Sequence, residues 1–204
     1  MRSQHLQLIL ASSSPRRAAL LRMLGLKFKV IPSNAQEALP KEGGDPREFC
    51  VANARLKALE VAGRIKCRAV VIGADTIVYH KGRVMGKPRT LEEAKRMLRS
   101  LSGGAHEVYT GLCVVRNDTW AYAAGYEVTR VYFKELSERE IEVYVNLENP
   151  LDKAGAYAIQ GLASLFVRKI EGDFFNVVGL PLHKLYELLS KIGFNLLEKL
   201  ASEG

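Results

Sequence analysis

The sequence predicts an α/β protein built on a mixed central sheet that helices flank. Short apolar runs alternate with amphipathic segments whose apolar residues recur at helical spacing, which is the pattern of α/β architecture. Residues 69–73 form a continuous apolar run, typical of a central strand covered on both faces. The 204 residues, 48% of them hydrophobic and 25% charged, can form one sizeable core. We therefore expect a single domain over residues 1–204.

Helix-start and helix-stop signals divide the first part of the chain. Ser14 before Pro15, and Asp45 before Pro46, each combine an N-cap side chain with a proline at the first helical position. Gly25 is a typical residue to end the first of these helices. We expect a strand, a helix, a strand and a helix in turn, at residues 6–11, 15–24, 28–31 and 46–62.

The middle of the chain adds the central strand and a hairpin. The apolar run at 69–73 is expected to end at residues 74–76. Lys and Gly at residues 81–82 then predict a tight turn between two short strands, at residues 77–80 and 83–85.

Two capping boxes open the helices of the second half. Thr90 with Glu93, and Ser137 with Glu140, place an acid three residues after an N-cap hydroxyl. The other elements expected here are paired strands at 106–116 and 119–133, an apolar strand at 156–170 interrupted by Gly161, and a terminal amphipathic helix at 182–200 with a weak point at Gly193.

The charge balance indicates a polyanionic partner. Lys and Arg number 30 against 22 Asp and Glu, for a net charge of +8, and no acid precedes Glu37. Nucleic acid, nucleotide phosphates and acidic lipid all fit a basic chain, and ordinary solubility charge is the alternative. The apolar run at residues 6–11 is too short for a signal segment, so we expect a cytoplasmic protein.

Several function classes find no support. No apolar run approaches the roughly 20 residues that cross a bilayer, so no membrane partner is expected. The three cysteines contain no C-x-x-C pair, and the four histidines show no H-E-x-x-H spacing. Structural zinc, a disulfide framework and zinc hydrolase chemistry are therefore poorly supported.

The junction between the first strand and the first helix is a candidate phosphate site. Free N–H groups and the positive end of the dipole at a helix N-terminus favour anions. Ser12 and Ser14 add hydroxyl donors there, and Arg16 and Arg17 can clamp phosphate oxygens. A serine cap followed by two solvent-facing arginines is the alternative.

Three further positions are candidates for chemistry. Asp75, expected at the carboxyl end of a buried strand, could activate a water or hold a metal, or simply form a local turn. Lys87, between Gly86 and Pro88, could point at a phosphate or be solvated. The plain interpretation of Lys57 is a surface lysine.

The segment at residues 150–161 carries a fourth group of polar residues. Asp152 and Lys153 could form an ion pair that orients a site, and the Gln160 amide could read the edge of a nucleobase. An ordinary ion pair and a strand glutamine explain the same residues equally well.

Together these segments resemble the Maf family of nucleoside triphosphate pyrophosphatases, in order, from about residue 8 to residue 189. The stretches that carry the resemblance are LILASSSPRRAALLRMLG, VVIGADTIV, GKPRTLEEAKRML, LSGGAHEVYTG, PLDKAGAYAIQG and VVGLPL. The resemblance implies a fold related to the inosine-triphosphatase-like pyrophosphatases, with a cleft between two lobes. It also implies hydrolysis of a nucleoside triphosphate to the monophosphate and pyrophosphate, a divalent cation (Mg²⁺ or Mn²⁺), and a homodimer.

The family branch that acts on dTTP and UTP is the one this sequence resembles. Arg16, Thr76 and Gln160 match its substrate-specificity positions, so dTTP, UTP and modified pyrimidine nucleotides are the substrates implied. Asp75 matches the general base of the family. On this resemblance, the roles expected of the remaining residues are phosphate binding for Ser12, Ser14, Arg16 and Arg17, charge compensation of the leaving pyrophosphate for Lys57 and Lys87, and metal binding for Glu37 and Asp75.

Two positions depart from the family pattern. The family often has two adjacent acids where this chain has Gln36 and Glu37, and an acid before Pro150 where this chain has Asn149. The competing interpretation is a non-catalytic protein, either a nucleic-acid-binding module or a regulator of cell division. If the protein is an enzyme, we expect no stable complex with nucleic acid.

Overall fold

A seven-stranded mixed sheet forms the centre of the structure, a computed structural model that describes residues 6–38 and 43–201. The strand order is β2-β1-β3-β5-β6-β7, and β4 pairs with β3 outside this path. The strands are β1 (Gln7–Leu10), β2 (Lys29–Val30), β3 (Ala69–His80), β4 (Arg83–Met85), β5 (Ala105–Arg116), β6 (Tyr122–Phe133) and β7 (Val167–Glu171).

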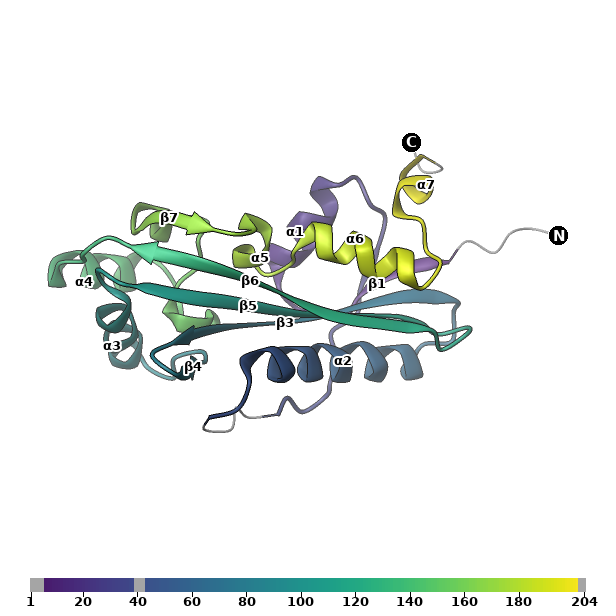
Figure 1. Cartoon of the computed structure of the whole chain (residues 1–204), viewed down its shortest axis with the longest axis horizontal. Helices are drawn as coiled ribbons and strands as arrows, with labels where there is room; N and C mark the ends of the chain where they lie inside the picture. Colours follow the sequence, from purple (N-terminus) through teal and green to yellow (C-terminus); the bar gives the residue numbers. More distant parts are fainter. Residues whose placement is uncertain (1–5, 39–42, 202–204) are drawn as a thin grey trace.

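Helices cover both faces of this sheet, which confirms the predicted fold class. Figure 1 shows α2 against one face and α1, α5 and α6 against the other, with α3 and α4 at one end of the long strands. The helices are α1 (Pro15–Met23), α2 (Pro46–Arg64), α3 (Leu91–Leu101), α4 (Glu138–Leu147), α5 (Phe174–Val178), α6 (Leu182–Lys191) and α7 (Leu196–Ala201). No helix within the described ranges is long and apolar enough to cross a membrane.

The predicted N-caps are confirmed. The side chains of Ser14 and Asp45 accept hydrogen bonds from the backbone N–H groups of Arg17 and Arg47 at the starts of α1 and α2. Ser137 forms a complete capping box with Glu140 at the start of α4. These local signals act within three residues, which is why the sequence alone could locate them.

Strand β3 is longer than predicted, and this corrects the position of Asp75. The sequence suggested a strand ending at residues 74–76 and a separate hairpin strand at 77–80, but β3 is one strand because β5 pairs with it from Val70 to Tyr79. On the opposite edge, β1 ends beside Ile72, and β4 pairs with β3 only from Val78 to His80. Asp75 therefore lies in mid-strand, along a stretch of edge that neither β1 nor β4 covers.

The apolar stretch at 156–170 is not a strand over most of its length, contrary to the prediction. It contains the short 3₁₀ turns η2 (Ala154–Ala156) and η3 (Leu162–Leu165), and only β7 joins the sheet. Positive φ angles of 66° at Ala156 and 83° at Gly161 turn the chain away from an extended path. Its alanine and aromatic side chains are buried by these turns, so apolar composition here reflects core packing rather than strand pairing.

The terminal helix divides at its predicted weak point. Gly193 has a φ of 71° and separates α6 from α7. Glycine adopts this left-handed conformation at little cost, and a left-handed residue cannot continue a right-handed helix, so the helix ends before it.

Two glycines let α2 lie unusually close to the sheet. A Cβ atom added to Gly73 of β3 would lie 2.2 Å from the carbonyl oxygen of Ala54, and one added to Gly111 of β5 would lie 2.2 Å from that of Cys50. Both acceptors are on α2. The missing side chains therefore bring the polar residues of α2 within reach of the middle of β3.

Candidate functional site

A cleft of about 650 Å³ lies along the uncovered edge of β3. One wall comes from the end of β1, the start of α1, the loop after β2 and helix α2, and the other from the loop after β4 and the turns η1 (Pro150–Asp152) and η2. Most of the predicted site residues line it, namely Ser12, Ser14, Arg16, Arg17, Glu37, Lys57, Asp75, Thr76 and Lys87. Gln160 is exposed and is not among the lining residues, although Ala158 is.

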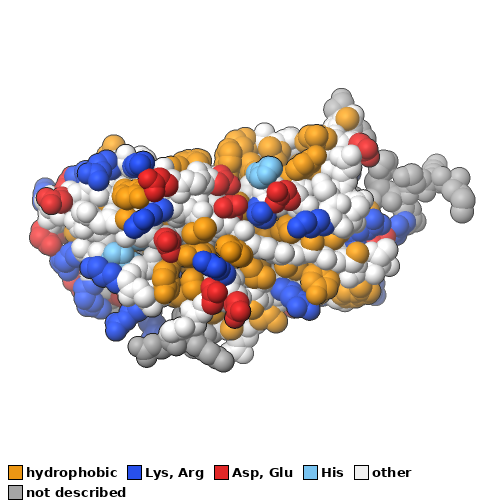
Figure 2. All heavy atoms as spheres, in the orientation of Figure 1, with side chains coloured by type: hydrophobic (Ala, Val, Ile, Leu, Met, Phe, Trp, Pro, Cys, Tyr) orange, Lys and Arg blue, Asp and Glu red, His pale blue; other side chains and the backbone are white. Residues whose placement is uncertain are grey.

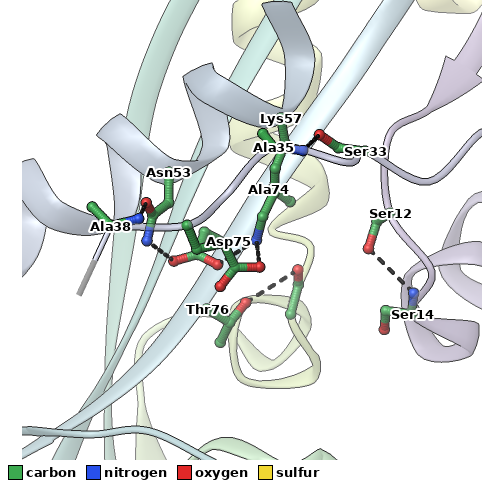
Figure 3. A network of polar contacts seen from close by, with 12 residues as sticks. Ser12, Ser14, Ser33, Ala35, Ala38, Asn53, Lys57, Ala74, Asp75 and Thr76 are labelled. Atoms are coloured by element: carbon green, nitrogen blue, oxygen red, sulfur yellow. Dashed lines mark hydrogen bonds and ion pairs between the residues drawn. The ribbon is translucent and has the colours of Figure 1, made fainter. Parts of the chain in front are cut away.

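The Asp75 carboxylate is the most constrained acid in the cleft. The Nζ atom of Lys57 lies 2.6 Å from its Oδ1 atom, and the Nδ2 group of Asn53 donates to its Oδ2 atom at 3.3 Å. Figure 3 shows both donors descending from α2 onto the strand. The side chains of Lys57 and Asp75 are only 12% and 10% exposed. Each oxygen of a nearly buried carboxylate thus has one donor, and lone pairs remain for a ligand or a water.

Lys57 also binds the second predicted acid. Its Nζ atom lies 2.8 Å from Oε1 of Glu37, whose side chain is 54% exposed. Burial on its own would raise the pKa of the Glu37 carboxyl, but the Lys57 ammonium, with Lys87 and Arg17 beyond it, holds that pKa below its usual value. The structure therefore brings Glu37 and Asp75 together around one ammonium group.

The loop that carries Glu37 is fastened to one face of α2. Asn53, Lys57, Glu60 and Arg64 follow one another at spacings of four, three and four residues, which places them on the same side of the helix. Sequence reasoning selected only Lys57 from this set. The polar stripe itself was the available signal, on a helix whose other buried positions are mostly apolar.

The remaining members of the stripe hold the backbone of that loop. Glu60 accepts hydrogen bonds from the Ser33 hydroxyl at 2.8 Å and from the Asn34 N–H group at 3.0 Å. Arg64 donates to the carbonyl oxygen of Pro32 at 2.8 Å. The loop therefore has a defined path across the mouth of the cleft.

The serines at the start of α1 make their contacts locally. The Ser12 hydroxyl accepts a hydrogen bond from the Ser14 N–H group at 3.2 Å, and Ser14 caps the helix. Figure 3 shows this turn across the cleft from Asp75. The N-terminus of α1 is thus open toward the same space as the two carboxylates.

Arg17 and Arg16, although adjacent, occupy different environments. The Arg17 guanidinium is buried and donates to four protein acceptors, which are the Gly179 carbonyl at 2.7 Å, Thr76 Oγ1 at 2.8 Å, Ser12 Oγ at 3.0 Å and the Ala74 carbonyl at 3.1 Å. Burial lowers its pKa, and the attraction of Asp75 opposes that shift. Arg17 thus joins α1, β3 and the end of α5, and its predicted contact with phosphate stays a prediction.

Arg16 instead points into the cleft. Its Nη1 atom lies 3.7 Å from Oδ2 of Asp152, which belongs to the other wall, and its side chain is 27% exposed. Asp152 is also paired with Lys153 at 2.9 Å, as the sequence suggested. Arg16 is therefore the arginine of the pair that a ligand can reach directly.

Thr76 faces the opposite side of β3 from Asp75. Its hydroxyl contacts that of Thr110 at 3.0 Å in addition to Arg17. Consecutive strand residues alternate between faces, so Asp75 and Thr76 address two sides of the same edge.

The departures from the family pattern lie at the margins. Asn149 caps η1 through a hydrogen bond from the Leu151 N–H group at 3.2 Å, and Gln36 is exposed. Neither of them lines the cleft.

Comparisons with known proteins agree with one another over most of the chain. The family described as "Maf-like protein" matches residues 7–192. A protein of Thermoanaerobacter sp. (strain X514) named dTTP/UTP pyrophosphatase is 46% identical over 91% of this chain and 96% of its own length. A protein of the same name from Pelotomaculum thermopropionicum is 48% identical over 94% of this chain and 99% of its own length.

A solved structure of a HAM1 protein from Coxiella burnetii is also similar, at 20% identity and a TM-score of 0.42, over 63% of this chain and 73% of that one. The family match and the curated relatives each extend over nearly the whole described sheet and its helices. This chain belongs to the family of Maf-like proteins.

Proposed function

We propose that this protein is a nucleoside triphosphate pyrophosphatase that hydrolyses dTTP and UTP to the monophosphate and pyrophosphate. The observation that carries the proposal is the Asp75 carboxylate, held by Lys57 and Asn53 in a cleft that also receives the N-terminus of α1. The names of the curated relatives, dTTP/UTP pyrophosphatase, support the same activity and substrates.

The triphosphate would lie between the two walls of the cleft. The N-terminus of α1 supplies the positive end of the helix dipole, and Arg16 adds a charged donor there, whereas the N–H groups of Ser14 and Arg17 are already bonded to serine hydroxyls. Lys57 and Lys87 line the same space. This arrangement offers positive charge along the length of a triphosphate, which is how phosphoryl-transfer sites stabilise developing charge.

The residues present fit a divalent cation. Glu37 and Asp75 both contact the Lys57 ammonium, and a divalent cation bound by the two carboxylates would take the place of that ammonium between them. Within the described residues, no group of three or more Asp, Glu, His or Cys side chains could hold a metal alone. Proteins usually bind Mg²⁺ through one or two carboxylates, and substrate phosphates and waters provide the remaining ligands. When bound, such an ion supplies positive charge against the phosphate oxygens.

Asp75 would act as the general base. It would orient a water and accept one of its protons while the water oxygen attacks the α-phosphorus. The bond from the α-phosphorus to the bridging oxygen then breaks, and pyrophosphate leaves with its charge offset by Lys57 and Lys87. A general base typically contributes about 10²–10⁴-fold to the rate.

Substrate choice would depend on residues around the base-binding end of the cleft. Arg16 lines the cleft directly, and Thr76 lines it from the face of β3 opposite Asp75. Gln160 would have to approach the ligand from outside the lining residues. Modified pyrimidine nucleotides would be accepted by the same pocket.

A panel of nucleoside triphosphates, assayed for pyrophosphate with Mg²⁺ and with chelator, tests the proposal. We expect dTTP and UTP to be hydrolysed faster than purine nucleotides, and chelator to abolish the release of pyrophosphate. Orthophosphate as the product, or a preference for GTP, would contradict the proposal. The homodimer and the cytoplasmic location stay predictions, and the first of these is checked by sedimentation.

The competing class is a non-catalytic protein that binds nucleic acid or regulates cell division. On the face seen in Figure 2, Lys and Arg side chains gather toward the end that carries α3 and α4, with acidic side chains among them. Mixed signs do not favour a polyanion groove there. An inert protein that binds polynucleotide tightly, with a steep dependence on salt, would support this class instead.

A further inference from the structure

Asn53 uses both ends of its amide inside the cleft. Its side chain is buried, with the residue 1% exposed, and it lines the cleft from α2. The Oδ1 atom accepts a hydrogen bond from the backbone N–H group of Ala38 at 3.0 Å, and Nδ2 donates to Oδ2 of Asp75 at 3.3 Å (Figure 3). A backbone N–H group can only donate, so the carbonyl of Asn53 must face Ala38 and its NH₂ group must face Asp75.

The second donor fixes the plane of the Asp75 carboxylate. Lys57 holds only Oδ1, and a carboxylate held through one oxygen can still rotate about the bond to that group. With Asn53 on Oδ2, rotation would break at least one of two hydrogen bonds. Asn53 is also neutral, so it orients the carboxylate without adding a charge that would compete for a substrate.

The other end of the amide acts on the second carboxylate through the backbone. Ala38 directly follows Glu37, and the Glu37 side chain lies 2.8 Å from the same Lys57 ammonium. One turn of α2 thus holds this loop at two points. Asn53 binds the backbone at Ala38, and Lys57 binds the side chain of Glu37. The distance between Glu37 and Asp75 is set by the spacing of these two residues along one helix face.

We propose that Asn53 is a positioning residue for the pyrophosphatase reaction, which orients Asp75 with its NH₂ group and fixes the loop of Glu37 with its carbonyl. This inference rests on the proposed function, because the role of Asn53 is defined by what Asp75 does. It assigns two separable tasks to the two ends of one amide, and single substitutions can therefore separate them.

Asn53→Asp keeps an acceptor for Ala38, removes the donor to Asp75 and sets a second carboxylate against it. We expect kcat for dTTP to fall about 10²-fold, as for a misplaced reacting group, while KM changes less than about threefold because Asn53 binds Ala38 and Asp75 rather than the residues expected to hold the phosphates. Hydrogen exchange at the Ala38 amide should stay as slow as in the unmodified protein. A loss of rate without a loss of loop protection is an outcome that a purely structural role would not produce.

Asn53→Leu has a similar size and removes both hydrogen bonds. Here kcat should fall at least as far, and the Ala38 amide should exchange at least about tenfold faster, since it has lost its acceptor. Comparison of the two variants shows whether the loss of kcat comes from the missing NH₂ group and whether the faster exchange at Ala38 comes from the missing carbonyl.

Asn117 provides a matched control. Its amide is used in the same manner, donating to the Cys67 carbonyl at 2.7 Å and accepting from the Ala69 N–H group at 2.8 Å. It contacts the start of β3, six residues from Asp75 and so roughly 20 Å away at about 3.3 Å per residue. Asn117→Asp should lower the melting temperature and leave kcat and KM unchanged.

The possible results are distinct. Folded Asn53 variants with the kcat of the unmodified protein, or with a raised KM at unchanged kcat, would overturn the positioning role while the proposed function stands. An unmodified protein that releases no pyrophosphate from any nucleoside triphosphate would overturn the proposed function and, with it, any part for Asn53 in a reaction. The Ala38 exchange rates would still decide whether the carbonyl fixes the loop.

Discussion

The Lys57 ammonium lies 2.6 Å from the Asp75 carboxylate, and both side chains are about nine-tenths buried. A nearly buried carboxylate needs such a partner to stay charged, and a charged carboxylate is what a general base requires. The same ammonium reaches Glu37 on the surface side, so the pair connects the interior of the cleft to its mouth.

Asp75→Asn should reduce pyrophosphate release from dTTP by about 10²–10⁴-fold, because the amide cannot accept the proton of the attacking water. The shape of the side chain is unchanged, so the fold should persist. Steady-state kinetics and a thermal melt measure both quantities. Asp118→Asn is the control, since Asp118 is bound by Arg68 and Arg116 at the β5–β6 turn, away from the cleft. Equal activity of the two variants would show that Asp75 is not the base.

Arg17 and Arg16 should respond to lysine substitution in opposite ways. Lysine at position 17 cannot reach four acceptors, and it would leave buried oxygens of Gly179 and Ala74 without donors. We expect Arg17→Lys to lower the free energy of unfolding by at least about 3 kcal/mol, since hydrogen bonds from charged groups contribute about 1.5–3 kcal/mol each.

Arg16→Lys should change that free energy by less than about 1 kcal/mol, because its ion pair with Asp152 is long and partly exposed. Its effect should appear as a higher KM for dTTP. Urea denaturation and steady-state kinetics on the two variants distinguish these expectations. A stable Arg17→Lys protein would mean that its four hydrogen bonds contribute little.

Gly111→Ala should disturb the site from the neighbouring strand, because Gly111 of β5 is paired with Asp75 and lies under the same helix α2. The new methyl group would meet the Cys50 carbonyl at 2.2 Å, so α2 would have to move away and carry Asn53 and Lys57 with it. Overpacking of this kind typically costs about 1–3 kcal/mol, and we expect a loss of activity beyond the loss of folded protein.

Gly63→Ala is the control for the same helix. A methyl group there meets only Trp120 at an ordinary 3.9 Å, and alanine favours a helix over glycine by up to about 1 kcal/mol. This variant should be as stable as the unmodified protein or more so, with the same activity. Thermal melts of the pair test the close approach directly, and similar melting temperatures would contradict it.

The buried His106 should make the fold sensitive to acid. Its Nε2 atom is hydrogen-bonded to the Tyr157 hydroxyl at 2.6 Å, and burial, with a smaller contribution from His80, lowers its pKa to about 3. In the unfolded chain the pKa of a histidine is about 6.5. Between these values the unfolded chain binds a proton that the folded protein does not, so stability falls as the pH falls, by up to about 1.4 kcal/mol per pH unit.

His106→Gln removes this titration and keeps a polar partner for Tyr157. Urea midpoints at pH 7 and pH 5 should therefore differ less in the variant than in the unmodified protein. If the two proteins lost stability equally on acidification, the buried neutral histidine would not be the cause.

The sequence predicted the features that local chemistry decides. The caps at Ser14, Asp45 and Ser137 depend on residues within one helical turn, and all three helices begin there. The length of β3 could not be read locally, because its continuity past Asp75 depends on pairing with β5, which begins only at Ala105. The strand predicted at 156–170 was wrong for a similar reason: Gly161 marked an interruption, but the positive φ angle of Ala156 leaves no mark in an apolar composition.

The candidate site shows the same division. Motifs selected Asp75, Lys57 and Arg16, which line one cleft. The motifs could not tell which arginine of the adjacent pair is buried and which faces the cleft, because the acceptors of Arg17 include Gly179, 162 residues away. Asn53 was missed because its significance lies in the loop that folds onto it.

The gap between β1 and β4 also bears on self-association. An unpaired strand edge at the rim of a sheet can recruit a strand from another molecule and so seed aggregation. Here the stretch that has no strand partner, residues 73–77, is enclosed at both ends by strands of the same sheet and measures about 16 Å at about 3.3 Å per residue, and Arg17 already binds its Ala74 carbonyl. A strand from another molecule would collide with β1 or β4 unless it were shorter than this gap. A small extended ligand meets no such obstacle. The edge can therefore accept a small molecule without promoting aggregation.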